Sequence, residues 1–219
     1  KEGVHEVVYG VRESTLSTSK YYYMTLPAGT TFPDGSKLEK ETLFAINGGG
    51  CRTSTDGGVT WDNTYPVTDN APEGKQPAGG FSQGGWIFDS VTGRMMFECY
   101  RSVDKVTDEN HIHTKIIASD DGGKTWYLQY TMPCRQCMDG YLGDNRIPGY
   151  ILSYSDGIQL STYDGKGPNV DFIFPAGYSY DNNGNFACYP CYSTDGGYTW
   201  HYSKNPVTYP TTYFGEEGG

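Results

Sequence analysis

Charge and long apolar segments are both scarce in this chain of 219 residues. Charged residues make up 19% of it, and acidic side chains outnumber basic ones by 26 to 16, which gives a formal net charge of −10. Because nucleic acids and anionic membrane surfaces are bound by clustered Lys and Arg, this balance argues against both partners. No apolar run approaches the roughly 20 residues of a membrane-spanning helix, so we predict no membrane insertion.

Runs of helix-forming residues are scarce as well. Stretches rich in Ala, Leu, Glu or Lys are few, whereas the chain has 30 Gly, 12 Pro and 20 Tyr. This composition favours an all-β protein whose solubility rests on Ser, Thr, Asn, Gly and Tyr, as on many secreted surfaces. No signal peptide is visible, and a start at Lys1 is compatible with a mature form. We therefore expect an extracellular protein, secreted or at the cell surface.

One short phrase occurs three times and organises the chain. Its five shared residues are Ser54, Asp56, Gly58, Thr60 and Trp61, then Ser119, Asp121, Gly123, Thr125 and Trp126, and finally Ser193, Asp195, Gly197, Thr199 and Trp200. The Asp can accept hydrogen bonds from nearby backbone amides, the Gly can adopt a positive φ, and Thr followed by Trp begins a strand. Each copy is therefore predicted to be an anchored hairpin turn in a repeat array.

This phrase resembles the Asp box of sialidase-type (BNR-repeat) β-propellers. The resemblance implies Asp-box propeller blades, each a four-stranded antiparallel sheet, with the boxes on the outer rim and away from a substrate pocket. It implies architecture more than activity, because Asp boxes occur in sialidases, other glycan-active enzymes and non-catalytic proteins alike. Asp56, Asp121 and Asp195 are therefore interpreted as structural residues, and not as catalytic or metal-binding ones.

The repeats divide a single domain, residues 1–219, into about three blades near 15–68, 78–133 and 140–206. The expected strands are 21–26, 42–46 and 50–53, then 86–88, 95–100, 113–118 and 126–132, then 147–154, 158–163, 186–192 and 200–202. Segments 4–11 and 209–214 are predicted to be terminal strands without partners. Because the smallest closed propellers have about four blades, we expect an incomplete propeller that is completed by another copy or a second chain. A truncated fragment is the alternative.

The cysteines are predicted to form disulfides. They are Cys51, Cys99, Cys134, Cys137, Cys188 and Cys191. An even number in a Gly-rich and Tyr-rich β-chain fits this prediction. The economical pairing joins 134 with 137, 188 with 191, and 51 with 99, and bridges between the two C-x2-C pairs are an alternative. A four-thiolate zinc site at those two pairs is a further alternative, although the prediction carries no metal and no cofactor.

Arginines are few, which bears on catalysis. The sialidase resemblance implies three arginines around a substrate carboxylate, a Tyr nucleophile activated by a Glu, and an Asp acid/base. Arg146-Ile147-Pro148 matches the phrase that carries the first arginine, so Arg146 is a candidate carboxylate ligand. A structural ion pair with a nearby loop acid is the alternative. Arg52 and Arg94, in or beside predicted turns, are expected to be solvated. A complete sialidase site on this chain alone is not expected.

The surplus of aromatic residues favours binding over catalysis. Candidate binding residues are Tyr22, Trp86, Tyr178 and Tyr189, which could stack on sugar rings, together with Arg146. The same surplus suits self-assembly, since Tyr is common at interfaces. We expect a structural or interaction role in an extracellular assembly, or glycan binding. The alternative is a sialidase-like glycoside hydrolase fragment, or a polysaccharide lyase, with an incomplete active site.

Overall fold

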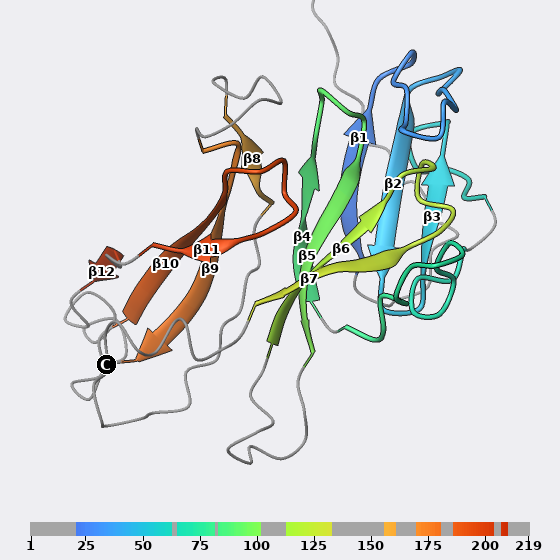
Figure 1. The fold of residues 1–219 in the computed structure, drawn as a ribbon. Helices are drawn as coiled ribbons and strands as arrows, with labels where there is room; N and C mark the ends of the chain where they lie inside the picture. Colours follow the sequence, from blue (N-terminus) through green and yellow to red (C-terminus); the bar gives the residue numbers. More distant parts are fainter. Residues whose placement is uncertain are drawn as a thin grey trace, which may run out of the picture.

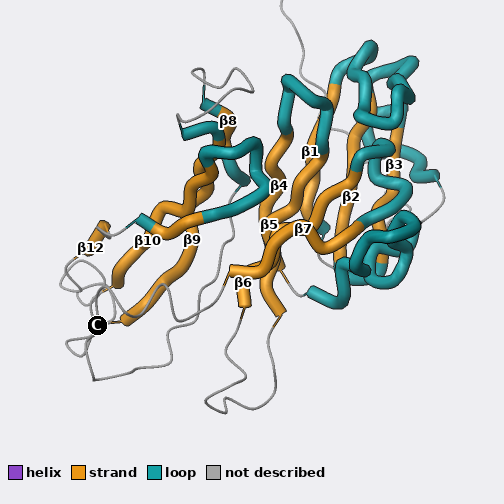
Figure 2. The backbone as a smooth tube through the Cα atoms, viewed as in Figure 1, coloured by secondary structure: helices purple, strands orange, loops and turns teal. Residues whose placement is uncertain are grey.

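The computed structural model describes residues 21–62, 65–81, 83–101, 113–132, 156–160, 170–180, 186–203 and 207–209. Within these ranges every regular element is a β-strand (Figure 2). The strands form three antiparallel sheets that follow one another in chain order (Figure 1). The prediction of an all-β fold is confirmed, and none of the three sheets closes into a barrel. No helix in the described ranges has the length and apolarity to cross a membrane.

The first sheet has three strands. They are β1 (Tyr22–Leu26), β2 (Thr42–Asn47) and β3 (Gly50–Ser54), in the order β1-β2-β3 and close to the predicted bounds. The β2–β3 turn closes because Asn47 Oδ1 accepts hydrogen bonds from the amides of Gly49 and Gly50, at 2.9 and 3.0 Å. The fourth strand that the propeller resemblance implies is absent from the described part of this sheet, where Tyr65, after the first box, makes an isolated bridge to Cys51.

The second sheet is a four-stranded meander, as predicted. Its strands are β4 (Gln83–Phe88), β5 (Met95–Arg101), β6 (His113–Ser119) and β7 (Tyr127–Met132). The β4–β5 turn is held by Asp89, whose Oδ1 accepts the amide of Val91 at 2.9 Å and whose Oδ2 accepts the hydroxyl of Thr92 at 2.5 Å. Short polar side chains that bond their own backbone stabilise tight turns of this kind.

The third sheet differs most from the prediction. Its strands are β8 (Ile158–Gln159), β9 (Phe172–Tyr180), β10 (Phe186–Ser193), β11 (His201–Tyr202) and β12 (Val207–Tyr209). The nine-residue β9 was not predicted, and its Pro175 and Gly177 are residues that disfavour strands. In the structure Pro175 pairs with Pro190, so the two residues without an amide hydrogen face each other, and the register shift between Cys188 and Tyr189 leaves Gly177 without a partner.

Two further expectations concern strands near the ends of the chain. The predicted lone strand at 209–214 is wrong at its first residue, because Tyr209 belongs to β12 and pairs with Phe186 of β10. The β12 strand thereby continues the outer edge of the third sheet that β11 begins. The predicted strands at 4–11 and 147–154 lie outside the described residues.

The sheets stack face to face along the chain. The first strand of the second sheet, β4, contacts β1 on one side and β8 on the other. On the β8 side, the Trp86 amide donates to Asp156 Oδ1 at 2.8 Å, and the Gly157 amide donates to the Trp86 carbonyl at 2.7 Å. On the β1 side, a buried apolar cluster fills the space between the first two sheets. It includes Leu26, Phe44, Ile46 and Cys51 from the first sheet and Trp86, Phe97, Cys99 and Trp126 from the second sheet and its box.

An ion pair within the second blade lies beside the third Asp box. Arg94 Nε donates to Asp120 Oδ1 at 2.8 Å, and the Arg94 side chain is only 12% exposed. Its guanidinium also lies over the ring of Tyr198 in the third box, 4.7 Å from the centroid. The expectation of a solvated Arg94 is therefore wrong, because its side chain is held by Asp120 of its own blade and by the Tyr198 ring of the third box.

Candidate functional site

The three Asp boxes share one hydrogen-bond geometry. In each, the Asp carboxylate accepts the Ser hydroxyl at 2.8–2.9 Å, the Thr hydroxyl at 2.6 Å and the Thr amide at 2.8–3.0 Å. The Trp indole N–H donates to the carbonyl of the second Gly at 2.9–3.1 Å. Both glycines of every box have a positive φ, as predicted for the second. Since both carboxylate oxygens are engaged within the turn, the geometry favours a structural role for the Asp.

In the first and third boxes, these hydrogen bonds lower the pKa of the Asp carboxyl group. Bonds from the Thr60 hydroxyl and amide, and from Ser54, lower the pKa of Asp56 to about 2. For Asp195, burial acts to raise the pKa, but the bonds from Thr199 and Ser193 outweigh it and the pKa is lowered. The first and third boxes therefore favour the ionised form of their Asp, which is the form that accepts hydrogen bonds with both oxygens.

A dependence of stability on acid follows from the lowered values. An unfolded Asp has a pKa of about 3.9. The hydrogen bonds of the boxes therefore stabilise the fold above that pH. This stabilisation is lost as the pH falls toward the lower pKa of the folded state. We expect the free energy of unfolding, measured with urea, to decline as the pH is lowered from about 4 to about 2. The Asp56→Asn variant should show a shallower decline, and equal slopes for both proteins would contradict the assignment.

Two of the predicted sugar-stacking residues, Tyr22 and Trp86, have described side chains, and both pack against Phe97. Trp86 is only 2% exposed and packs against the rings of Phe97 and Trp126, at centroid distances of 5.3 and 5.8 Å. The prediction that Trp86 binds a ligand is therefore wrong, because its ring belongs to the core between the first two blades. Tyr22 is partly exposed, and its ring meets Phe97 edge-on at 5.5 Å.

The other candidates are not tested by the structure. Tyr178 lies on β9 and Tyr189 on β10, but their side chains are not among those described. Arg146 lies outside the described residues, as do Cys134 and Cys137. Their roles in binding, disulfide formation or zinc binding stay predictions.

The predicted disulfide between Cys51 and Cys99 is wrong. Both residues are free thiols that are fully buried. Cys51 lies on β3 of the first sheet and Cys99 on β5 of the second, where each contributes to the apolar cluster between the sheets. Burial raises the pKa of both thiols, so they behave as small apolar side chains. Cys191 is also buried.

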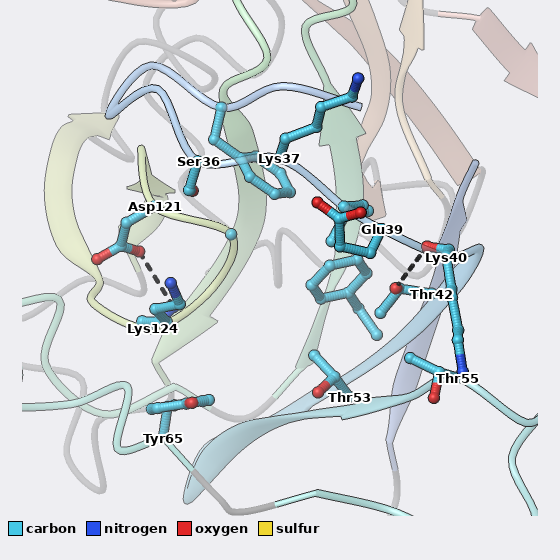
Figure 3. A pocket seen from close by; sticks show the side chains of 14 residues that line it. Ser36, Lys37, Glu39, Lys40, Thr42, Thr53, Thr55, Tyr65, Asp121 and Lys124 are labelled. Atoms are coloured by element: carbon cyan, nitrogen blue, oxygen red, sulfur yellow. Dashed lines mark hydrogen bonds between the residues drawn. The ribbon is translucent and has the colours of Figure 1, made fainter. Parts of the chain in front are cut away.

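A cavity at the rim of the first two blades was not predicted. Its volume is about 420 Å³, and it lies between the 31–42 segment, strands β2 and β3, and the second Asp box (Figure 3). Phe32 and Phe44, both buried, contribute its apolar part. The hairpin that carries Phe32 is fixed by Asp34, whose Oδ1 accepts the amide of Ser36 at 2.8 Å. This size falls within the range of small-molecule sites.

Three lysines and two acidic residues line this cavity. Lys37 and Lys40 line it from the first blade and Lys124 from the second box, and all three are exposed. None of the three forms an ion pair with a described residue. Glu39 lies between Lys37 and Lys40 in the view of Figure 3, and Asp121 is engaged by its own box.

Hydroxyl groups line the rest of the rim cavity. They come from Ser36, Thr42, Thr53, Thr55 and Tyr65. An anionic compound with several hydroxyl groups could therefore bind here: its negative charge would contact the lysine ammonium groups, and its hydroxyls would form hydrogen bonds with the side-chain hydroxyls. The signal in the sequence was Lys37-Leu38-Glu39-Lys40, but only the fold shows that Lys124, more than 80 residues later, faces the same space.

Comparison with known proteins supports the architecture inferred from the boxes. No family model matches the chain. The sequence is similar to a sialidase of Micromonospora viridifaciens, with 29% identity over 195 residues. The aligned region covers 80% of this chain and 28% of that sialidase. The chain thus corresponds to less than a third of that protein, and the similarity together with the three sheets points to a sialidase-like fold.

Proposed function

We propose that this protein is an extracellular, sialidase-like propeller module that binds acidic carbohydrate at its rim cavity, in an interaction role and without hydrolysis. The observation that carries the proposal is the cavity of about 420 Å³ in which three lysines without ion pairs to described residues surround an apolar floor and several hydroxyls. The similarity to a sialidase favours a glycan as ligand. The low charge and the Gly-rich and Tyr-rich composition favour an extracellular location.

The chemistry of the cavity fits a sugar that carries a carboxylate. Ammonium groups bind carboxylates through charge-assisted hydrogen bonds, and Lys37, Lys40 and Lys124 approach the space from two blades. Tyr65 and the neighbouring threonines can bond sugar hydroxyls, while Phe32 and Phe44 offer apolar surface to a ring face. The same cavity offers no carboxylate free for acid/base work except the exposed Glu39.

Titration with sugars tests the proposal. The protein is titrated by calorimetry with N-acetylneuraminate and glucuronate, and with galactose as the neutral comparison. We expect binding of the acidic sugars only. Lys37→Ala and Lys124→Ala should each weaken it about two- to fivefold, the effect of one exposed charged contact. Lys75→Ala, a lysine that lies over Tyr127 and away from the cavity, should leave binding unchanged. Equal affinity for galactose, or no binding at all, would contradict the proposal.

A sialidase-like hydrolase fragment is the second candidate, favoured by the sequence similarity to a sialidase. Its site would include Arg146 as the ligand of the substrate carboxylate. Release of free sugar from an acidic glycoside, abolished in Arg146→Ala and retained in Lys124→Ala, would establish this candidate in place of the rim-cavity binder.

A further inference from the structure

The first Asp box is less covered than the other two. Trp126 and Trp200 are both 0% exposed, whereas Trp61, the corresponding residue of the first box, is partly exposed. Beside it, at a ring distance of 6.1 Å, Tyr23 of β1 is 48% exposed. The Tyr23–Trp61 pair corresponds to the Trp86–Trp126 pair of the second blade, which is buried beneath the first blade.

The second and third boxes show what covers such a face. A Cβ placed on Gly123 would lie 3.1 Å from Cys51 Sγ of the first sheet, and one on Gly197 would lie 2.6 Å from Met96 Sδ of the second sheet. Each box thus packs against side chains of the blade before it. A Cβ on Gly58 would meet only Leu43 and Trp61 of its own blade.

At the first box, the described residues leave open the space that a preceding blade would fill. In the second box, the ring of Phe32 from the first blade lies over Gly122, 2.8 Å from a Cβ placed there. At the corresponding Gly57, the structure has an open hollow of about 380 Å³, which Leu43 and Asp56 also line. In the second box, the ring of Phe32 occupies the position that corresponds to this hollow.

The far side of the third sheet carries two isoleucines among its described residues. Phe172 is fully buried and packs against Trp200, on the side of the third box. Since side chains alternate along a strand, Ile173 lies on the opposite face, and Ile158 is its partner across the β8–β9 ladder. Ile158 is 59% exposed. The three-sheet stack thus ends in an aromatic box face on one side and an isoleucine pair on the other.

We propose that a second copy of this chain covers the first-blade face, with the isoleucine side of its third sheet packed on Tyr23 and Trp61. Within one chain, the box face of the second blade packs on the first blade, and that of the third blade packs on the second. The proposed contact between copies repeats this arrangement, and it joins two different surfaces. The three sheets of the described residues, taken from two copies, give six, which lies within the roughly four to eight blades of closed propellers. The hollow at Gly57 shares Lys40 and Thr55 with the rim cavity, so the second copy would approach the edge of that cavity.

Light scattering across a range of protein concentrations measures the assembly. We expect the mass to rise from 24.2 kDa toward twice that value as the concentration increases. Tyr23→Asp and Ile158→Asp should each remain monomeric, because each places a charge in the proposed contact. Val91→Asp is the matched control, since Val91 is 53% exposed in the β4–β5 turn, and it should associate like the unmodified protein.

Mixing the two variants distinguishes this contact from a symmetric one. In a mixture of Tyr23→Asp with Ile158→Asp, one intact contact can form between the unaltered Ile158 of one chain and the unaltered Tyr23 of the other. We therefore expect the mixture to form dimers that neither variant forms alone. Circular dichroism checks that both variants are folded. A monomer at every concentration, a dimer that survives Tyr23→Asp, or no rescue on mixing would overturn the proposal.

Discussion

Replacing Trp126 with Ala is expected to lower the free energy of unfolding by about 3–5 kcal/mol, the usual cost of removing a large buried aromatic side chain. Trp126 is 0% exposed, packs against Trp86, and belongs to the apolar cluster that joins the first two blades. Its indole N–H also donates to the Gly123 carbonyl at 3.0 Å. Urea unfolding, followed by circular dichroism at low protein concentration, measures the loss.

The first box supplies the matched control for that experiment. Trp61 has the same indole hydrogen bond to its own box, at 3.1 Å to the Gly58 carbonyl, but it is partly exposed. Trp61→Ala should therefore cost clearly less, about 1–2 kcal/mol. Because both tryptophans belong to the same motif and make the same hydrogen bond, the difference between the two losses in unfolding free energy measures the contribution of the blade that covers Trp126. Equal losses for the two variants would mean that the faces of the first two blades are equally covered.

Gly93→Ala is the second substitution with a large expected effect. Gly93 has a φ of +80° in the β4–β5 turn, and a Cβ there would lie 1.9 Å from the carbonyl oxygen of Thr31 in the first blade. An added methyl would both strain the left-handed backbone, by about 1–2 kcal/mol, and push the first blade away, by about 1–3 kcal/mol. We expect a total loss of about 2–5 kcal/mol in urea unfolding.

Gly35→Ala separates these two causes. Gly35 has a nearly equal φ of +85°, but nothing lies within 4 Å of a Cβ placed there. This variant should lose only the backbone contribution of about 1–2 kcal/mol. A loss as large as that of Gly93→Ala would show that the contact between the first two blades does not stabilise the fold.

Much of the fold was predictable because the boxes mark turns between strands. The four strands of the second sheet follow the predicted pattern, since that segment has clear turns at Asp89 and at the second box. The third sheet was predicted less well. Pro175 and Gly177 have low strand propensity, so local sequence does not predict β9. The strand forms because it pairs along the length of β10. Tertiary pairing there overrides the local preference.

The candidate site was predicted poorly, for a related physical reason. Aromatic residues signal either a core or a binding surface, and Trp86 belongs to the core because the first blade stacks on it. Cys51 and Cys99 likewise serve the apolar junction between two sheets, and neither forms a disulfide. The rim cavity combines Lys37 with Lys124, and only the stacking of the second box on the first blade brings them together. Contacts between blades are not encoded in any local pattern.

Hydroxyl-radical footprinting read by mass spectrometry, at about 1 µM and about 100 µM protein, tests most directly whether these blades stack in series with one face left for a second copy. The account predicts that Trp61 and Tyr23 are oxidised at the low concentration and protected at the high one. Trp126 and Trp200 should be protected at both. Oxidation of Trp126 as fast as that of Trp61, or protection of Trp61 at every concentration, would contradict the account.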